Sequence, residues 1–150
     1  MHIISRLSLL LFAASLTLSV AAQKDEKVFT GIHVFGIGTS FNDSTVYIST
    51  PQFMADATLQ KKTGFMENRA KYAFQMKTYL EANYSPNETC AIFFAKTHKK
   101  LEKKYQKVRR RLLKRGVRIV EIPDNEFTFQ FIPSPSQQQV SQQKANKKRR

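Results

Sequence analysis

The first part of the chain after residue 27 carries the pattern of a β-hairpin. In residues 28–41, VFTGIHVFGIGTSF, apolar side chains occupy both alternation phases, which is typical of a central strand covered on both faces. The turn-forming residues 42–44 (NDS) follow. TVYIS at residues 45–49 then has the β-branched and aromatic content of a second strand. The two runs together predict a hairpin.

Helical periodicity begins after an ambiguous stretch. Thr50 and Pro51 resemble the N-cap and the first position of a helix, so we expect a short helical turn and a loop within residues 51–64. Between residues 65 and 83, apolar residues recur at helical spacing, namely Phe65, Tyr72, Ala73, Met76, Tyr79 and Leu80. Pro86 lies just beyond this predicted amphipathic helix and favours its end there.

A second helix is predicted between two strands. ETCAIFFA at residues 88–95 is apolar throughout its middle and predicts a buried strand. Thr97 is placed to cap a helix over residues 98–115, and Gly116 has the position expected just after a helix. VRIVEI at residues 117–122 predicts the next strand.

One more alternating run completes the predicted fold. In EFTFQFI at residues 126–132, three Phe side chains fall on one face of a last strand. The chain is therefore expected to be an α/β (α+β) sandwich with one mixed sheet of about five strands and two amphipathic helices, in the order ββαβαββ. The strand–helix–strand crossover favours parallel pairing of residues 88–95 with residues 117–122. The pattern leaves open whether the helices share one face of the sheet.

The N-terminal 22 residues have the features of a secretory signal peptide. Arg6 precedes an apolar stretch, and Val20, Ala21 and Ala22 form the small-residue pattern of a cleavage site. The stretch is shorter than the roughly 20 apolar residues of a membrane-spanning helix. We therefore expect residues 23–132 to form a single exported domain, periplasmic or secreted. Residues 133–150, rich in Gln and basic residues, are expected to be a disordered tail.

The composition limits the chemistry of the chain. Its 150 residues include a single cysteine, Cys90, so an intrachain disulfide is excluded. Three His and one Cys, scattered at positions 2, 33, 90 and 98, do not supply the four ligands of a structural zinc site. Neither a metal nor another cofactor is expected. Cys90 lies in an apolar run and is expected to be an inert, buried thiol.

The net charge of +14 is confined to two segments. Residues 98–115 hold ten basic residues and one acid, Glu102, and residues 144–150 hold five more cations, so the rest of the chain is electrically balanced. Apolar residues four, three and four apart predict a buried stripe on the helix and leave the cations on its outer face. The candidate polyanion-binding residues are Lys99, Lys100, Lys103, Lys104, Lys107, Arg109, Arg110, Arg111, Lys114 and Arg115 of the helix and Lys147, Lys148, Arg149 and Arg150 of the tail.

Two interpretations of the basic helix remain open. It is either a solvated face that keeps the protein soluble, or a docking face for a polyanion such as nucleic acid, lipopolysaccharide or an acidic membrane surface. Pairs of like charges, Lys103 and Lys107 among them, recur four residues apart along this helix. Such pairs destabilise a helix, and a solubility role does not require them.

The sequence does not decide whether the protein is an enzyme, but it favours a non-enzymatic protein. An enzyme of an unrecognised class would use His33, Cys90 or His98 at a pocket. The glycines of Gly36-Ile37-Gly38 lie inside a strand and open no helix, so a bulge or a close backbone approach explains them better than a phosphate-binding loop. A further alternative is a protein-interaction module in which the strand at residues 126–132 is an exposed edge.

Four motifs occur together in this chain: Ala22-Gln23 at the cleavage site, the hairpin SFNDSTVYIST, the helix RAKYAFQMKTYL and the strand NETCAIFFA. With these motifs, residues 1–132 resemble a loosely defined set of small exported proteins of Bacteroidetes-type Gram-negative bacteria. The resemblance implies a periplasmic or secreted location. The set has no established function, and the resemblance carries over no catalytic residue. The expected function is therefore that of an exported, non-enzymatic binding or envelope-associated protein that docks a polyanion.

Overall fold

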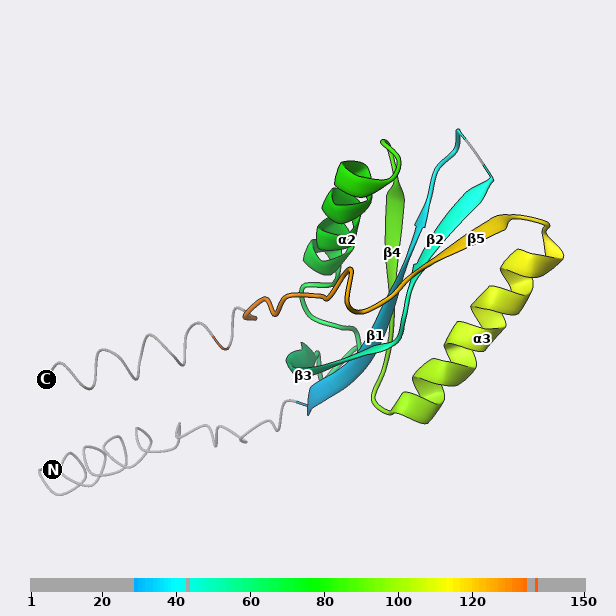
Figure 1. Cartoon of the computed structure of the whole chain (residues 1–150). Coiled ribbons are helices and arrows are strands. Elements are labelled where there is room, and N and C mark those ends of the chain that lie inside the picture. Colours follow the sequence, from blue (N-terminus) through cyan, green and yellow to red (C-terminus); the bar gives the residue numbers. More distant parts are fainter. Residues whose placement is uncertain (1–28, 43, 135–136, 138–150) are drawn as a thin grey trace, which may run out of the picture.

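The computed structural model describes residues 29–42, 44–134 and 137, which form one sheet with a helix on each face (Figure 1). The elements are, in chain order, β1 (Phe29–Thr39), β2 (Thr45–Ser49), β3 (Gln52–Leu59), α2 (Arg69–Asn83), β4 (Thr89–Ala95), α3 (His98–Lys114) and β5 (Arg118–Ile122). Five strands in a mixed sheet and two helices confirm the predicted class. The order differs from the predicted one, because a third strand follows the hairpin and no strand follows β5 within the described residues.

The long strand β1 lies at the centre of the sheet. β4 pairs with one edge of β1, from His33 to Thr39. β2 and β3 both pair with the other edge of β1, one after the other. Together they form the second arm of the predicted hairpin, with a break between them. All three pairings are antiparallel. The hairpin between β1 and β2 is confirmed.

The predicted helical start at Thr50 and Pro51 is wrong. These residues separate β2 from β3, and the chain then continues as a strand instead of forming a helical turn. Pro51 has no N–H with which to join the ladder. The Thr50 N–H donates instead to the carbonyl oxygen of Ile122 at 3.0 Å. Pairing with β1 resumes at Gln52, opposite Val34.

The predicted parallel pairing of residues 88–95 with residues 117–122 is also wrong. β5 pairs in parallel with β2, and β4 pairs with β1, so β4 and β5 lie on opposite sides of the β1–β2 pair. Their direction agrees with the prediction, because β4 and β2 are both antiparallel to β1 and β5 is parallel to β2. The crossover through α3 is right in direction but spans two more strands than expected.

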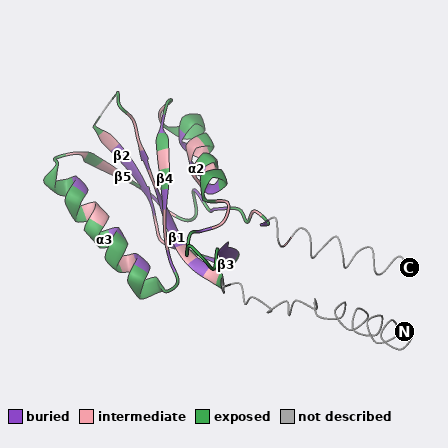
Figure 2. Cartoon of the chain, turned by 180° about the vertical axis from the view of Figure 1, so that it is seen from behind, coloured by how far each residue is buried: buried purple, intermediate pink, exposed green. Residues whose placement is uncertain are grey.

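The two helices cover opposite faces of the sheet, as Figures 1 and 2 show. Alternate residues of β1 therefore enter different cores, which confirms that the central strand is covered on both faces. The core under α2 includes Ile32, Val34, Tyr72, Met76 and Leu80. The core under α3 consists of Phe35, Ile48, Ala95, Leu101 and Tyr105.

The glycines at 36 and 38 allow α2 to lie close to β1. A Cβ atom at Gly36 would be 2.2 Å from the Met76 Sδ, and a Cβ atom at Gly38 would be 2.2 Å from the Leu80 Cδ1. Both distances are far below van der Waals contact, so any side chain at these positions would displace the helix or its side chains. A close approach is therefore the reason for the glycines.

The predicted strand at residues 126–132 is wrong, although its alternation has a physical basis. The segment forms no strand and joins no sheet; instead, it crosses the α2 face, where Phe127 and Phe129 are buried in the core and Phe131 is 42% exposed. Two side-chain amides replace a partner strand. The Gln52 amide exchanges hydrogen bonds with the Phe127 carbonyl and the Phe129 N–H, and the Gln75 amide exchanges two with the backbone of Gln130.

The domain continues slightly past its predicted boundary at residue 132. The Asn68 side chain, just before α2, donates to the Ile132 and Pro133 carbonyl oxygens at 3.1 Å each. Ser134 is buried, and the Gln137 amide donates to the Asp56 carbonyl oxygen at 3.3 Å. The predicted signal peptide and the remainder of the tail lie outside the described residues.

Candidate polyanion-binding face

The basic helix α3 begins and ends at the predicted signals. The Thr97 side chain accepts a hydrogen bond from the Lys100 N–H, which caps the N-terminus. Gly116 has a φ of 69°, a left-handed conformation that follows many helices and that glycine adopts without strain. These local signals place the helix over His98–Lys114.

The predicted apolar stripe attaches α3 to the sheet. Leu101, Tyr105 and Leu112 are buried, and Val108 is half-buried against the same core. The Tyr105 ring meets the Phe35 ring edge-on, with 5.2 Å between the ring centroids. The helix is therefore held along its length, and the opposite side chains face outward.

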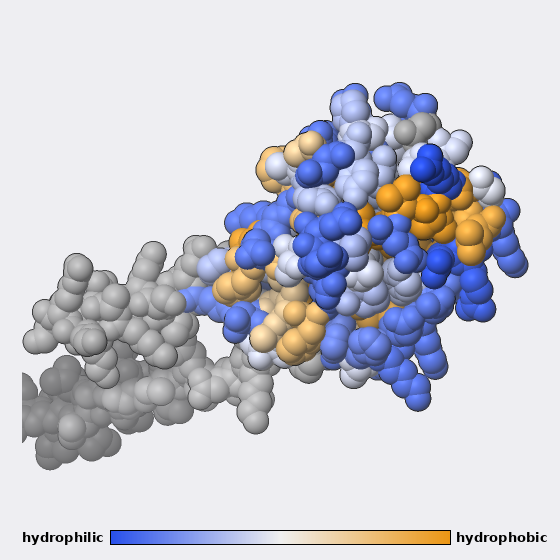
Figure 3. All heavy atoms as spheres, in the orientation of Figure 1, coloured by the Kyte–Doolittle hydropathy of each residue, from blue (hydrophilic) through white to orange (hydrophobic). Residues whose placement is uncertain are grey.

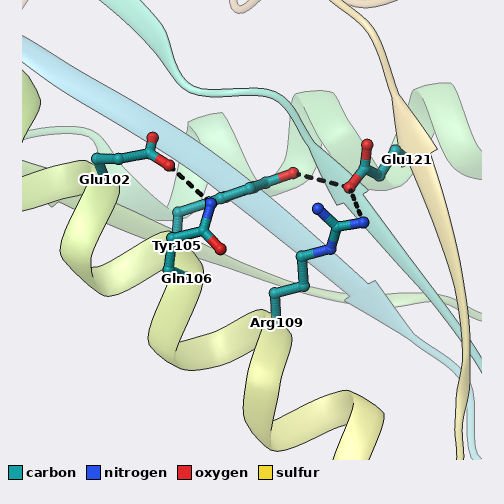
Figure 4. Close-up of polar contacts among 5 residues, drawn as sticks. All are labelled: Glu102, Tyr105, Gln106, Arg109 and Glu121. Atoms are coloured by element: carbon teal, nitrogen blue, oxygen red, sulfur yellow. Dashed lines mark hydrogen bonds and ion pairs between the residues drawn. The ribbon is translucent and has the colours of Figure 1, made fainter.

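Glu121 of β5 fixes the middle of the helix with two polar contacts (Figure 4). The Tyr105 hydroxyl donates to the Glu121 Oε1 at 3.3 Å, and the Arg109 Nη2 lies 3.1 Å from the same oxygen. Burial, together with the nearby Glu121 carboxylate, raises the pKa of Tyr105 to about 12, so the hydroxyl stays a donor at neutral pH. Sequence reasoning missed this role of Glu121. The sequence feature that could have indicated this role is an acidic residue in the strand that directly follows a basic helix.

Lys104 also serves the fold. Its Nζ donates to the Phe94 carbonyl oxygen of β4 at 2.7 Å and lies 5.6 Å from the centre of the Phe94 ring. Lys104 and Arg109 thus bind other parts of the domain. Two of the ten predicted helix cations therefore have contacts within the domain.

The other eight cations form the outer face of α3. All are exposed, and none forms an ion pair with an acid in the part of the chain that the structure describes. Hydrophilic side chains gather in Figure 3 at the lower right, where Figure 1 places the first part of α3. The eight residues are Lys99, Lys100, Lys103, Lys107, Arg110, Arg111, Lys114 and Arg115.

Four of these cations lie in a single row opposite the buried stripe. Lys103, Lys107, Arg110 and Lys114 are four, three and four residues apart, the same spacing as the stripe but two residues further along. We call this row the basic ridge. At 1.5 Å per residue it extends for about 16 Å along the helix axis.

The positions of these charges do not stabilise the helix. No acidic residue lies in the first turn of α3, where the helix dipole favours negative charge, and Lys99 and Lys100 occupy that turn instead. Only Arg111 and Lys114, in the last turn, are placed favourably. Each unfavourable charge costs a few tenths of a kcal/mol or more, so helix stability does not account for the pattern.

Of the other candidate residues, the structure describes His33, Cys90 and His98. The tail cations Lys147, Lys148, Arg149 and Arg150 lie outside the described residues. His33 and His98 are neighbours, with 5.6 Å between their ring centroids. Burial and the nearby His98 lower the pKa of His33.

Cys90 does not form a dyad with either histidine. His33 is paired with Ala95, at the opposite end of β4 from Cys90, which corresponds to about 16 Å along the strand. Burial, together with the Glu88 carboxylate, raises the pKa of Cys90 to about 12, so the thiolate is disfavoured. The raised pKa fits the expected inert thiol, although Cys90 is half-buried and not buried as predicted.

The comparisons with known proteins identify no relative. No family model, no curated protein and no solved structure matches the chain. Within the described residues, no group of three or more His, Cys, Asp or Glu could hold a metal ion. No described helix is long and apolar enough to cross a membrane. The resemblance to exported Bacteroidetes-type proteins stays a prediction.

Proposed function

We propose that this chain is an exported, non-enzymatic binding protein that docks a polyanion on the outer face of α3. The observation that carries the proposal is the basic ridge with its flanking cations, which have no acidic partners among the described residues. The sheet supports the helix, so the backbone that carries these charges is already ordered before a ligand binds. The predicted tail cations would add electrostatic reach.

A merely solvated face would not need this arrangement. Solubility is served by charges of both signs spread over a surface. Here the cations lie together on one side of one helix, where they repel one another. Two of them also lie in the first turn, where the helix dipole disfavours positive charge. A polyanion would relieve that repulsion and release its own counterions on binding.

The proposal is tested with the chain from residue 23, which contains every described residue, against duplex DNA, lipopolysaccharide and vesicles of acidic lipid. The test variant carries Lys103→Glu, Lys107→Glu and Arg110→Glu. The control carries Lys62→Glu, Arg69→Glu and Lys71→Glu, which remove the same charge from exposed positions away from α3. A second form ends at Gln137 and so removes the tail beyond the described residues.

The ridge variant should lose most of its binding, whereas the control should keep it. For DNA, each lost phosphate contact lowers the slope of log K against log salt by about 0.9, so the ridge variant should lose about 2–3 units of slope. Equal losses in both variants would show that only net charge matters and would contradict a docking face. Loss on removing the tail alone would assign binding to the tail, and the panel itself ranks the three ligand classes.

A further inference from the structure

The outer edge of β4 carries backbone groups that pair with no other strand of the described sheet. In an antiparallel ladder, the N–H and C=O of alternate residues point to the same side. The Phe94 carbonyl points away from β1, because it accepts the hydrogen bond from Lys104. The backbone groups of Cys90 and Ile92 therefore point outward as well. Lys104 thus occupies one of the outward backbone groups of this edge.

This edge lacks the protection that edge strands usually carry. β4 reads TCAIFFA, seven residues without a charge, a proline or a glycine. At the other end of the sheet, β5 has five residues and includes Arg118 and Glu121. A flat, uncharged edge strand readily pairs with another strand.

A depression of about 250 Å³ adjoins the edge at Cys90. Ala70, Ala73, Phe74 and Lys77 of α2 line one side of it, and Glu88, Thr89 and Cys90 line the other. Phe74 is 66% exposed there, although it is a large apolar residue. Apolar side chains of α2 thus lie beside the strand edge, next to the charged residues Lys77 and Glu88.

We propose that β4 pairs with β4 of a second copy of this chain, antiparallel and centred on Ile92. The outward backbone groups lie symmetrically about Ile92, so a two-fold axis there pairs all of them: Ile92 with its counterpart, and Cys90 with Phe94 of the second copy. The contact is isologous, as in most dimers. It extends the sheet from five strands to ten.

The side chains favour a second copy over an unrelated strand. Cys90 and Phe94 both pack on the α2 face of β4. In this register they are directly opposite across the interface, with about 5 Å between their Cβ atoms. Each half-buried Phe94 ring therefore reaches the depression beside Cys90 of the other copy, and Lys104 moves off the Phe94 carbonyl. The same symmetry supplies two such insertions.

The pairing does not use the basic ridge, so it is independent of the polyanion proposal. A two-fold axis between antiparallel strands of one sheet is perpendicular to that sheet. The two α3 helices consequently lie on the same face of the joined sheet. If the face also binds a polyanion, the dimer presents two basic ridges to one ligand.

The test measures self-association of the chain from residue 23 by sedimentation equilibrium, without any polyanion and at about 0.5 M NaCl to screen charge repulsion. Phe74→Lys puts a cation into the depression and should weaken the dimer at least tenfold. Phe41→Lys is the matched control, because Phe41 is 97% exposed and does not line the depression. Lys104→Met, which removes the group on the Phe94 carbonyl, should tighten the dimer.

Amide hydrogen exchange locates the contact. The Cys90 and Ile92 amides should exchange at least tenfold more slowly at a protein concentration where the dimer forms than at one where it does not. A chain that stays monomeric up to about 1 mM, with both amides exchanging rapidly, overturns the proposal and leaves the edge to a strand of a different protein. A dimer whose affinity is unchanged by Phe74→Lys, or one in which these amides still exchange rapidly, also overturns it.

Discussion

Gln52 and Gln75 hold the C-terminal segment with the same pair of hydrogen bonds in two different environments. The Gln52 Nε2 donates to the Phe127 carbonyl oxygen at 2.7 Å, and its Oε1 accepts from the Phe129 N–H at 3.0 Å, all buried. The Gln75 amide makes the equivalent bonds to Gln130 at 2.8 and 2.9 Å, exposed to solvent. Replacing each glutamine by methionine keeps its length and removes both bonds.

The two substitutions should differ in cost because water replaces only the exposed bonds. Gln52→Met leaves two buried backbone groups without partners, at about 1–3 kcal/mol each, so we expect a loss of about 2–4 kcal/mol once the segment relaxes. Gln75→Met leaves groups that water can reach, and its cost should stay below about 1 kcal/mol.

Urea unfolding followed by circular dichroism measures the difference. With an m-value of about 2 kcal/mol/M, the midpoint should fall by about 1–2 M for Gln52→Met and by less than about 0.5 M for Gln75→Met. Exchange of the Phe129 amide should accelerate only in the Gln52 variant. Equal midpoint shifts for the two variants would refute the reasoning, because burial would then not decide the cost.

Three further predictions concern single side chains. Leu101→Ala removes a fully buried side chain under α3 and should cost about 2–5 kcal/mol in urea unfolding, whereas Leu113→Ala, at a position 57% exposed, should cost less than about 0.5 kcal/mol. Gly36→Ala should cost about 1–3 kcal/mol, because its Cβ would lie 2.2 Å from the Met76 Sδ; unchanged stability would mean that α2 moves away freely. The pKa of Cys90 is raised from 9.0 in the unfolded chain to about 12 in the folded chain, so folding favours the neutral thiol. The resulting contribution to the free energy of unfolding is constant below about pH 9 and is lost as the pH rises toward 12. Cys90→Ala should flatten that alkaline decline, and iodoacetamide at pH 8 should alkylate the native thiol at least tenfold more slowly than the unfolded one.

The sequence by itself determined the features that depend on neighbouring residues. Thr97 and Gly116 bracket α3, and the spacing of its apolar residues separates a buried stripe from the basic face. The same holds for β1, whose two apolar phases predict cover on both faces. Caps, helical periodicity and strand alternation act within a few residues, so a single chain displays them.

Only the tertiary structure decided which strands are neighbours. The apolar middle of β4 indicates burial, and the crossover through α3 indicates the direction of β5, but both would be equally satisfied by adjacent strands. β5 instead lies beside β2, where it receives the Thr50 N–H and where Glu121 meets Arg109 of α3. These contacts join residues far apart in the chain, and no local pattern encodes them.

The C-terminal segment shows the same division most clearly. Its alternating Phe residues indicate one buried face, which is right for Phe127 and Phe129 but not for Phe131, which is 42% exposed. A strand also needs a free sheet edge beside it, and here the segment lies across the α2 face, where Gln52 and Gln75 supply the hydrogen bonds. Alternation reports which side chains are buried, whereas backbone hydrogen bonding depends on what the fold brings alongside. For that reason the basic face could be predicted from residue spacing, and the exposed edge of β4 could not.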